Sequence, residues 1–339
     1  MEGVEERKGQ DCKVTGSAGS SRFDQIRTAC ERVATRARHV EIRRERIPAY
    51  AASLPTENAA FPELDPATHY LGHGDDTLAF LITIDAINFG SGYFPHLRKR
   101  PGMSGYFTIA ASLNDYYRKY GPPSAEQLAR ITRDDCARIF EQDPSNEIVQ
   151  ELMQFFAKAL NDLGNFILER FDGSFVKLVE SAGASAERLV QLLTGMPYFN
   201  DVETYKGMGV PFYKRAQLTV ADLSLAFNSE GAGYFSDLDQ LTIFADNLVP
   251  HVLRVNGILA YEENLAHRID TGQLIPPYSE EEVEIRACAV HAVELIKDEV
   301  RKAGHAITSM GLDYLLWNRG QQPYYKNVCP RHRTRTVFY

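Results

Sequence analysis

Apolar residues recur three or four positions apart along most of this chain, which is the spacing of helices that bury one face. The repeat runs from residue 23 to about residue 39, and a longer stripe fills residues 145–171. Residues 279–304 and 309–320 repeat the same pattern. The sequence therefore predicts a mostly helical protein.

Polar residues at the ends of these segments support the same boundaries. Ser124 is followed three residues later by Gln127, which is the spacing of a capping box. Ser279 and Glu282 mark the start of another helix, whose first turn is acidic and whose last turn is cationic. Gly304 follows that helix and is typical of a helix end. Because capping and apolar spacing agree, we expect helices at both places.

Strand patterns are scarce. Residues 39–44, "HVEIRR", form the one segment that suits a short strand. We find no internal repeat and no linker that divides the chain convincingly. We therefore expect one all-α domain over residues 22–339, preceded by a polar and mobile tail over residues 1–21.

The composition limits the partners that this protein can have. The chain has 339 residues, of which 44% are hydrophobic, and a formal net charge of -8. That balance argues against a broad duplex-DNA footprint, which needs a basic face. The cysteines are too scattered for a C-x-x-C pair, and no apolar run is long enough to span a bilayer. We expect a cytoplasmic protein with reduced thiols, no stable nucleic-acid partner, no membrane contact and no obligate protein partner.

The stretch "FNDVETYKGMGVPFYKRAQ", residues 199–217, concentrates charge and aromatic rings. It lacks clean strand alternation, and its two glycines indicate a turn before a helix that starts near residue 211. Free backbone N–H groups there, with Lys206, Lys214 and Arg215 nearby, would suit a phosphate. A solvated turn with surface cations is the simpler interpretation of the spacing alone, because the P-loop pattern is absent.

Acids inside or beside apolar segments form further candidates. Asp237 follows glycines and rings at the start of an expected helix, where it is either a plain N-cap or a site carboxylate. Asp246 lies in the apolar run "LTIFADNLVP" and must be paired or hydrogen-bonded there. Asp85 and Asn88 lie three residues apart and precede Phe89. They suit either a heterocyclic base or the packed end of a helix.

A further pair is Asp313 and Trp317, which lie four residues apart on one face of an expected helix. A core anchor beside a hydrogen-bonded acid is the simpler interpretation. The sequence has no G-x-S-x-G, H-E-x-x-H, Walker A or G-x-G-x-x-G motif. Any hydrolytic chemistry would therefore rest on carboxylates and cations rather than on a metal ion or a nucleophilic serine.

Several ordered blocks together carry a resemblance to a known family. The blocks "TYKG", "FYKRAQLTVADL", "YFSDLDQLTIFADNLVPHVL", "EVEIRACAVHAVELI" and "LDYLLWN" resemble the queuosine salvage proteins, the queuosine 5'-phosphate N-glycosylases. The resemblance implies an all-α fold similar to the helix-hairpin-helix DNA glycosylases, although this chain lacks their L-P-G-V-G hairpin. It also implies hydrolysis of the N-glycosidic bond of queuosine 5'-monophosphate, without a cofactor or metal ion. The queuine released would be reused for transfer-RNA modification.

The resemblance implies roles for particular residues. The catalytic aspartate of the family falls on Asp237, which would stabilise the sugar cation and activate water. The catalytic lysine falls on Lys206, and Lys214 with Arg215 would hold the 5'-phosphate. The other residues that we expect to bind substrate are His39, Asp85, Asn88, Phe89, Phe199, Asp201, Phe235, Asp246, Asp313 and Trp317.

Within this set, Asp246, or Asp85 with Asn88, would bind the polar edge of the base, and phenylalanine rings would stack on it. Asp313 and Asp201 would face the secondary ammonium of the cyclopentenediol arm. Two other functions stay open at this point. One is a DNA or RNA glycosylase that acts on flipped bases, and the other is a protein that binds queuine without catalysis.

Overall fold

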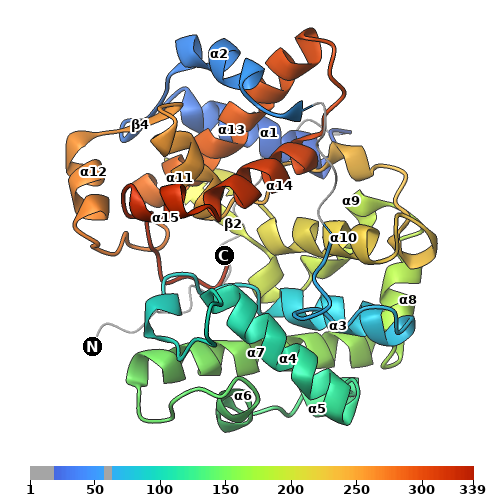
Figure 1. Ribbon diagram of the computed structural model, residues 1–339. Helices are drawn as coiled ribbons and strands as arrows, with labels where there is room; N and C mark the ends of the chain where they lie inside the picture. The colour runs from blue at the N-terminus through green and yellow to red at the C-terminus, as the bar shows by residue number, and fades with distance from the viewer. Residues whose placement is uncertain (1–18, 57–62) are drawn as a thin grey trace.

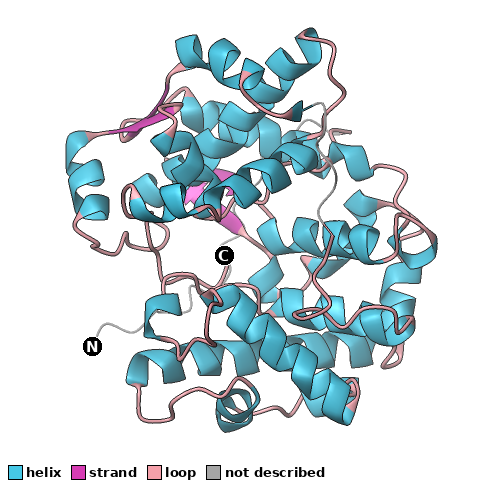
Figure 2. Cartoon of the chain, viewed as in Figure 1, coloured by secondary structure: helices cyan, strands magenta, loops and turns pink. Residues whose placement is uncertain are grey.

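The computed structural model describes residues 19–56 and 63–339 of the chain. Helices make up most of this part and the strands are short, which confirms the prediction of a mostly helical protein (Figure 1, Figure 2). The likeness to helix-hairpin-helix glycosylases and the domain boundary stay predictions. The expected mobile tail falls mainly outside the described residues, and Ser21 already caps the first helix.

Among the described residues, no helix is both long and apolar enough to cross a membrane. The α-helices are α1 (Arg22–Ala34), α2 (Ile47–Ala52), α3 (Asp75–Ala86), α4 (Gly105–Tyr120), α5 (Ala125–Leu128), α6 (Arg133–Ile139), α7 (Glu147–Phe171), α8 (Phe175–Glu180), α9 (Ala186–Leu193), α10 (Lys214–Ala226), α11 (Leu248–Val255), α12 (Glu263–Asp270), α13 (Glu280–Lys302), α14 (Ser309–Gly320) and α15 (Pro323–Asn327). The 3-10 turns are η1 (Arg44–Arg46), η3 (Phe94–His96), η4 (Pro197–Phe199), η5 (Gly231–Gly233) and η6 (Leu238–Gln240).

Many of the predicted helix ends are confirmed. The capping box of Ser124 and Gln127 forms at the start of α5, and Ser279 caps α13. Helices α7, α13 and α14 occupy the segments that the apolar spacing predicted. Helix α1 ends at Ala34 rather than near residue 39, because the chain turns at that point into the first strand.

The strands of the described residues form two antiparallel pairs. Strand β1 (Val40–Ile42) pairs with β4 (Leu259–Tyr261), and β1 lies within the one predicted strand. Strand β2 (Val202–Tyr205) pairs with β3 (Met208–Pro211) in a hairpin. The β1–β4 pair joins segments that are distant in the sequence, and the β2–β3 pair joins neighbouring ones. The core is built mainly from the helices.

The β2–β3 hairpin corrects our interpretation of the glycine-rich stretch. Its loop consists of Lys206 and Gly207 alone, and both have positive φ, 47° and 79°. Two positive φ values in a two-residue loop are the signature of a type I′ turn, which glycine favours. The alternation is hidden in the sequence because a polar residue, Glu203, occupies a buried position in β2. The loop therefore leads into a strand, and the next helix starts only at Lys214.

The helices pack in two groups around a hydrophobic core. Helix α13 packs against α1, α2, α11 and α14, and α7 packs against α3, α5, α6 and α8 (Figure 1). A Cβ at Gly164 of α7 would lie 2.3 Å from the backbone nitrogen of Ala129, so glycine is needed for this close approach. Helix α10 packs against α3 and α9, and Arg215 near its start donates to the carbonyls of Asp85 and Ala86 at the C-terminal end of α3.

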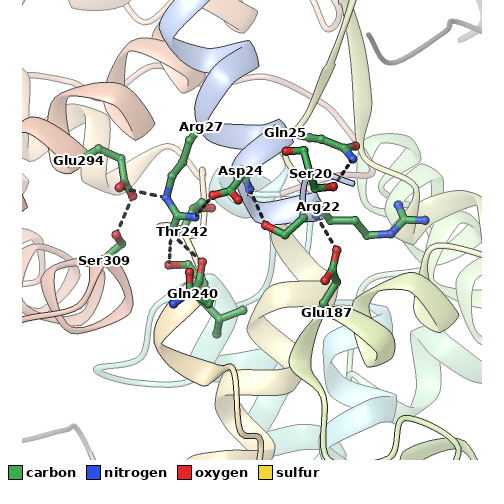
Figure 3. Close-up of polar contacts among 12 residues, drawn as sticks. Ser20, Arg22, Asp24, Gln25, Arg27, Glu187, Gln240, Thr242, Glu294 and Ser309 are labelled. Carbon is green, nitrogen blue, oxygen red and sulfur yellow. Dashed lines mark hydrogen bonds and ion pairs between the residues drawn. The ribbon is translucent and has the colours of Figure 1, made fainter. Parts of the chain in front are cut away.

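Polar contacts join α1 to three distant segments (Figure 3). Arg27 Nε donates to Glu294 on α13 (3.1 Å), and its Nη2 donates to the carbonyl of Gln240 (2.6 Å). The backbone N–H of Arg22 donates to Glu187 near the start of α9 (2.6 Å). Because Gln240 leads into the extended segment before α11, helix α1 fixes one end of that segment.

Candidate active site

Helix α10 carries two charged groups of the candidate site. Lys214 opens the helix and Asp222 follows eight residues later, which keeps both within one helical stripe. Their side chains are only 6% and 4% exposed, and most of α10 around them is buried. Charged groups in such a position need partners, because an unpaired buried charge is costly.

The ammonium group of Lys214 is buried in the electrostatic field of several acids. Its Nζ donates to the carbonyl of Asn88 (3.3 Å), and its backbone N–H donates to Asp201 Oδ2 (3.2 Å). Burial lowers the pKa of Lys214, and the negative charges of Asp246 and Asp85 oppose that decrease. The charges that favour the protonated form of Lys214 against burial therefore come from other segments of the chain.

Asp246 lies in an extended segment that three helices hold by its backbone. Helix α10 binds it at Thr242 (2.9 Å), α14 at Phe244 (2.9 Å) and α13 at Ala245 (3.0 Å). The side chains that make these bonds are Gln217, Asp313 and Arg286. Consecutive anchors of this kind leave the segment little freedom, so Asp246 is presented in one place.

The carboxylate of Asp246 is fixed through one of its oxygens. Oδ1 accepts the backbone N–H groups of Leu248 and Val249 at the start of α11, at 2.8 and 3.2 Å. Oδ2 takes no hydrogen bond from the residues that the structure describes, and the side chain is partly exposed. The position of Asp246 is thus fixed by hydrogen bonds, and one of its carboxylate oxygens is left for a ligand.

Asp85 lies at the C-terminal end of α3 and is fully buried. Its Oδ1 accepts from Asn88 Nδ2 at 3.5 Å, its Oδ2 is buried without a partner in good hydrogen-bond geometry, and Thr219 lies near the carboxyl group. Burial raises the pKa of Asp85 to about 7, and the charge of Lys214 opposes the rise. This carboxyl group can therefore hold or release a proton near neutral pH.

Two further acids complete what we call the acid–lysine cluster. Burial raises the pKa of Asp222, and the charge of Asp85 adds to the effect. Burial likewise raises the pKa of Asp313, and the charge of Asp246 adds to it. The cluster consists of Asp85, Asp222, Asp246 and Asp313 around Lys214.

Aromatic side chains border the cluster. Burial raises the pKa of both Tyr106 and Tyr314, and the charge of Asp222 adds to the rise, so both phenols lie near that acid. The hydroxyl of Tyr314 donates to Asp222 Oδ1 at 3.5 Å. Trp317, one turn after Asp313, packs edge-on against Phe107 with 6.1 Å between ring centres. Partly exposed rings of this kind suit a flat heterocycle.

The structure brings together a subset of the residues predicted from the sequence. Those that meet in or beside the cluster are Asp85, Asn88, Lys214, Asp246, Asp313 and Trp317. Sequence reasoning missed Asp222, Tyr106 and Tyr314. The spacing of Asp222 from Lys214 on an expected helix was a usable signal, whereas nothing local marked the two tyrosines.

Arg215 is committed to the fold rather than to a phosphate. It is 1% exposed, and its guanidinium lies between the rings of Phe89 and Phe199, 4.8 Å from each ring centre. It donates to the backbone carbonyls of Asp85, Ala86, Tyr198 and Val337. Its Nη1 and Nη2 are used by these carbonyls and its Nε is buried without a partner, so Arg215 exposes no donor to a phosphate, which disfavours the predicted contact. Both rings pack on the guanidinium.

Asp201 is also committed. Its two oxygens accept from Arg286 Nη1 and Nη2 at 3.0 and 2.6 Å, and both side chains are buried. Oδ2 also accepts the backbone N–H of Lys214. A carboxylate that is saturated in this way is not free to face a substrate ammonium, which corrects that prediction.

Asp237 caps a neighbouring helix. Its carboxylate accepts the backbone N–H groups of Ala186 and Glu187 (2.5 and 3.1 Å) and the hydroxyl of Ser185 (2.9 Å), at the start of α9. It precedes the short 3-10 turn η6 rather than an α-helix, and Phe235 beside it is buried. The structure does not bring Asp237 into the acid–lysine cluster.

Lys206 lies in the exposed hairpin loop and contacts a different group of residues. Its Nζ donates to the carbonyl of Arg36 (3.0 Å) and lies 3.8 Å from Glu280. Glu280 belongs to a group with His39 and Glu284 whose possible ligand atoms lie within 4.8 Å of one another. Lys206 and His39 are therefore near each other, but no contact links them to the acid–lysine cluster among the described residues.

The carboxylate of Glu284 is already used as a backbone clamp. It accepts the N–H groups of Arg38, His39 and Val40, and the hydroxyl of Tyr205. A cavity of about 490 Å³ lies beside this clamp and is lined in part by Arg38 and His39. The acceptor oxygens of Glu284 therefore hold the start of β1 in place.

The part of the chain that matches a known protein family includes every residue of the acid–lysine cluster. Residues 68–339 match the family model described as queuosine salvage protein. The chain belongs to the queuosine salvage protein family. This confirms the resemblance that the sequence blocks indicated.

Curated relatives of the family span most of the chain. A protein of Sphaerobacter thermophilus is 37% identical over 321 residues, which cover 93% of this chain and 97% of that protein. A protein of Mus musculus is 32% identical over 310 residues, 86% of this chain and 90% of its own. A protein of Dictyostelium discoideum is 37% identical over 216 residues, 63% and 65% respectively. All three are named queuosine 5'-phosphate N-glycosylase/hydrolase.

Proposed function

We propose that this protein hydrolyses the N-glycosidic bond of queuosine 5'-monophosphate, and so releases queuine for reuse in transfer-RNA modification. The names of relatives that match nearly the whole chain support this proposal. The observation that carries it is the carboxylate of Asp246, which the start of α11 holds through one oxygen while the other is left for a ligand, in the electrostatic field of the buried Lys214. Cleavage of a C1'–N bond needs a group of this kind, because positive charge develops on the sugar.

Asp246 takes the part that the sequence blocks implied for Asp237. In the proposed reaction the C1'–N bond breaks and its electron pair leaves with the base, while water adds to C1'. A carboxylate beneath C1' stabilises the sugar cation and accepts the proton of the attacking water. The backbone anchors around Asp246 hold the carboxylate before the substrate arrives, so little reorganisation is needed.

Lys214 would act on the sugar side of the breaking bond, and Asp85 would act on the side of the departing base. Lys214 lies within the field of Asp246 and would hold a ribose oxygen or the water in line with it. Asp85, with a pKa of about 7, would donate a hydrogen bond or a proton to the departing base. A 7-deazaguanine lacks the N7 that purine glycosylases protonate, so help must come at another edge of the ring.

The test is release of free base by the wild-type protein and by Asp246→Asn. Wild-type protein incubated with queuosine 5'-monophosphate should release queuine, detected by chromatography, and Asp246→Asn should lower kcat about 1,000-fold. Asp239→Asn, which changes an exposed acid, is the matched control and should keep the wild-type rate. Near-normal turnover by Asp246→Asn would overturn its role.

The other two functions give different results in the same experiments. A protein that only binds queuine would release no base in the wild-type assay. A glycosylase that acts on flipped bases would shift duplex DNA or RNA in a gel at low salt. The net charge of -8 disfavours that second outcome.

A further inference from the structure

The side chain of Asn247, the residue that follows Asp246, is used for tertiary contacts and not for a helix cap. Asn247 precedes α11, but its side chain makes no capping hydrogen bond there, and Asp246 accepts the first N–H groups of that helix instead. Asn247 is 4% exposed, and its Nδ2 donates to the hydroxyl of Ser91 (3.1 Å) and to the backbone carbonyl of His332 (3.3 Å). A backbone carbonyl can only accept, so the nitrogen of the amide has to face His332. Both bonds reach distant parts of the chain and fix the residue next to Asp246.

Ser91 lies in the turn that follows α3, and the same turn holds the tip of Lys214. Lys214 Nζ donates to the carbonyl of Asn88 (3.3 Å), three residues before Ser91. The turn is itself anchored, since the backbone N–H of Gly90 donates to the main-chain oxygen of Tyr339 (2.9 Å). One anchored turn therefore contacts both the ammonium group of Lys214 and the residue that follows the candidate carboxylate.

The segment after α15 closes the remaining side of this arrangement. His332 and Tyr339 both belong to it, so it contacts Asn247 and the turn after α3 at once. A Cβ at Gly92 would lie 2.3 Å from the carbonyl oxygen of Thr334, so the two backbones touch with no space for a side chain. The turn, the C-terminal segment and Asn247 thus support one another, and a shift of one requires a shift of the others.

These contacts fix a group that the buried ion pair does not. The pair of Asp201 and Arg286 holds backbone groups of the site, namely the N–H of Lys214 and the carbonyl before Asp246. Lysine ends in an ammonium group on a flexible four-carbon stem, so a bond to its backbone does not place the ammonium. The turn after α3 instead holds the ammonium group directly, and its bond to Asn247 relates that group to Asp246.

We propose that Ser91 and Asn247 are positioning residues: the hydrogen bond between them sets the separation of the Lys214 ammonium from the Asp246 carboxylate. This inference rests on the proposed function, in which those two groups act on the sugar and the attacking water. Ser91 and Asn247 act through them and take no part in the bond changes. Two groups placed before the substrate arrives lower the barrier of the chemical step, so loss of the bond should reduce kcat more than it raises KM.

The experiment measures queuine release by Ser91→Ala, Asn247→Ala and the double variant. Each single variant should lower kcat about 10-fold and change KM less than about twofold. Because both substitutions remove the same hydrogen bond, the double variant should fall no further than Asn247→Ala alone. Ser91→Thr keeps the hydroxyl and should retain kcat within about twofold of the wild type. Ser91 is partly exposed, so its two variants keep the test available even if Asn247→Ala fails to fold.

Asn256→Ala is the matched control, because Asn256 carries the same amide at the opposite end of α11. Its Nδ2 donates to the carbonyl of Val252 (2.7 Å) and to the hydroxyl of Tyr325 (3.0 Å), neither of which belongs to the acid–lysine cluster. This variant should lower the melting temperature and keep kcat within about twofold of the wild type.

Three results would overturn the positioning role. They are a wild-type kcat in Ser91→Ala, losses in the two single variants that multiply in the double variant, and an equal loss of kcat in Asn256→Ala, which would trace the effect to stability. Each of them leaves the proposed function intact as long as the wild-type protein releases queuine. A wild-type protein that releases no base would refute both.

Discussion

Two regions of the molecule bury a cation beside aspartates, and they differ in how completely the charges are satisfied. Arg286 donates to both oxygens of Asp201 (3.0 and 2.6 Å) and to the carbonyl of Ala245 (3.0 Å), between two aromatic rings. Lys214 makes one hydrogen bond of 3.3 Å through its Nζ and is shared by the four acids of its cluster. The first region is saturated, and the second leaves acceptors for a ligand.

This difference separates groups that hold the structure from groups that act on a substrate. A buried pair with complete hydrogen bonding resists change, whereas an incomplete cluster costs stability and is typical of a functional site. The two regions are also connected. Asp201 accepts the backbone N–H of Lys214, and Arg286 holds Ala245, which precedes Asp246. The saturated pair therefore positions both reacting groups of the proposed site.

Breaking the saturated pair should have the largest effect. Arg286→Met should lower the free energy of unfolding by about 3–5 kcal/mol, because it leaves Asp201 buried without its counter-charge. Base release should be lost as well, since Ala245 and Lys214 lose their shared support. Denaturant unfolding at neutral pH measures the first effect, and the queuine-release assay measures the second.

A surface pair of the same chemistry provides the control. Arg254 donates to Asp270 through two hydrogen bonds of 2.9 Å, and the side chains are 15% and 44% exposed, against 0% and 2% for Arg286 and Asp201. Arg254→Met should cost about 1 kcal/mol or less. The double variant Arg286→Met with Asp201→Asn should regain part of the stability but not the activity. An Arg286→Met variant no less stable than Arg254→Met would erase the contrast between the regions.

Removing the cation from the acid–lysine cluster should lower activity strongly and change stability little. Lys214→Met should lower kcat/KM about 100-fold. It should change the free energy of unfolding at mildly acidic pH by less than about 1 kcal/mol, because it also removes a buried charge. Kinetics on queuosine 5'-monophosphate and denaturant unfolding check the two parts. A large loss of stability at that pH would place Lys214 with the structural group.

The pH dependence of the same variant sharpens the test. Asp85 has an ordinary pKa of 3.8 and a folded-state pKa of about 7, so the folded protein binds its proton more tightly. Its contribution to stability is complete below the ordinary pKa and is lost as pH rises through the folded-state pKa. Without Lys214 the folded-state pKa should rise further. Lys214→Met should therefore lose stability more steeply than the wild type as pH rises toward and past neutrality, and parallel curves would exclude this coupling.

The helices were predictable because their signals are local. The capping box at Ser124 and the acidic first turn after Ser279 lie within a few residues of the helix starts that they mark. The β2–β3 hairpin was missed because Glu203 is a polar residue in a buried strand position. Its burial depends on packing against α13, from a distant part of the chain, which no local alternation reveals.

The site was predictable in residue type and less so in assignment. Lys214 and Asp246 stood out as candidates, but the sequence could not show that Asp246 has an oxygen without a partner. It also could not show that the carboxylate of Asp237 meets the start of α9, about 50 positions earlier in the chain. Likewise, Arg215 looked like a phosphate ligand until its donors were found on backbone carbonyls. These hydrogen bonds depend on tertiary packing, which local sequence patterns do not reveal.

The smallest expected effect tests that reassignment directly. Asp237→Ala removes the acceptor for two backbone N–H groups of α9, so it should cost about 1 kcal/mol of stability and change kcat by less than about twofold. Asp237→Asn, which keeps one acceptor oxygen, should recover part of that stability. Thermal unfolding and queuine release on the same preparations give both numbers. If Asp237→Ala folded normally and yet lost turnover about 1,000-fold, the carboxylate at α9 would be the catalytic one, and Asp246 would be left with the capping of α11.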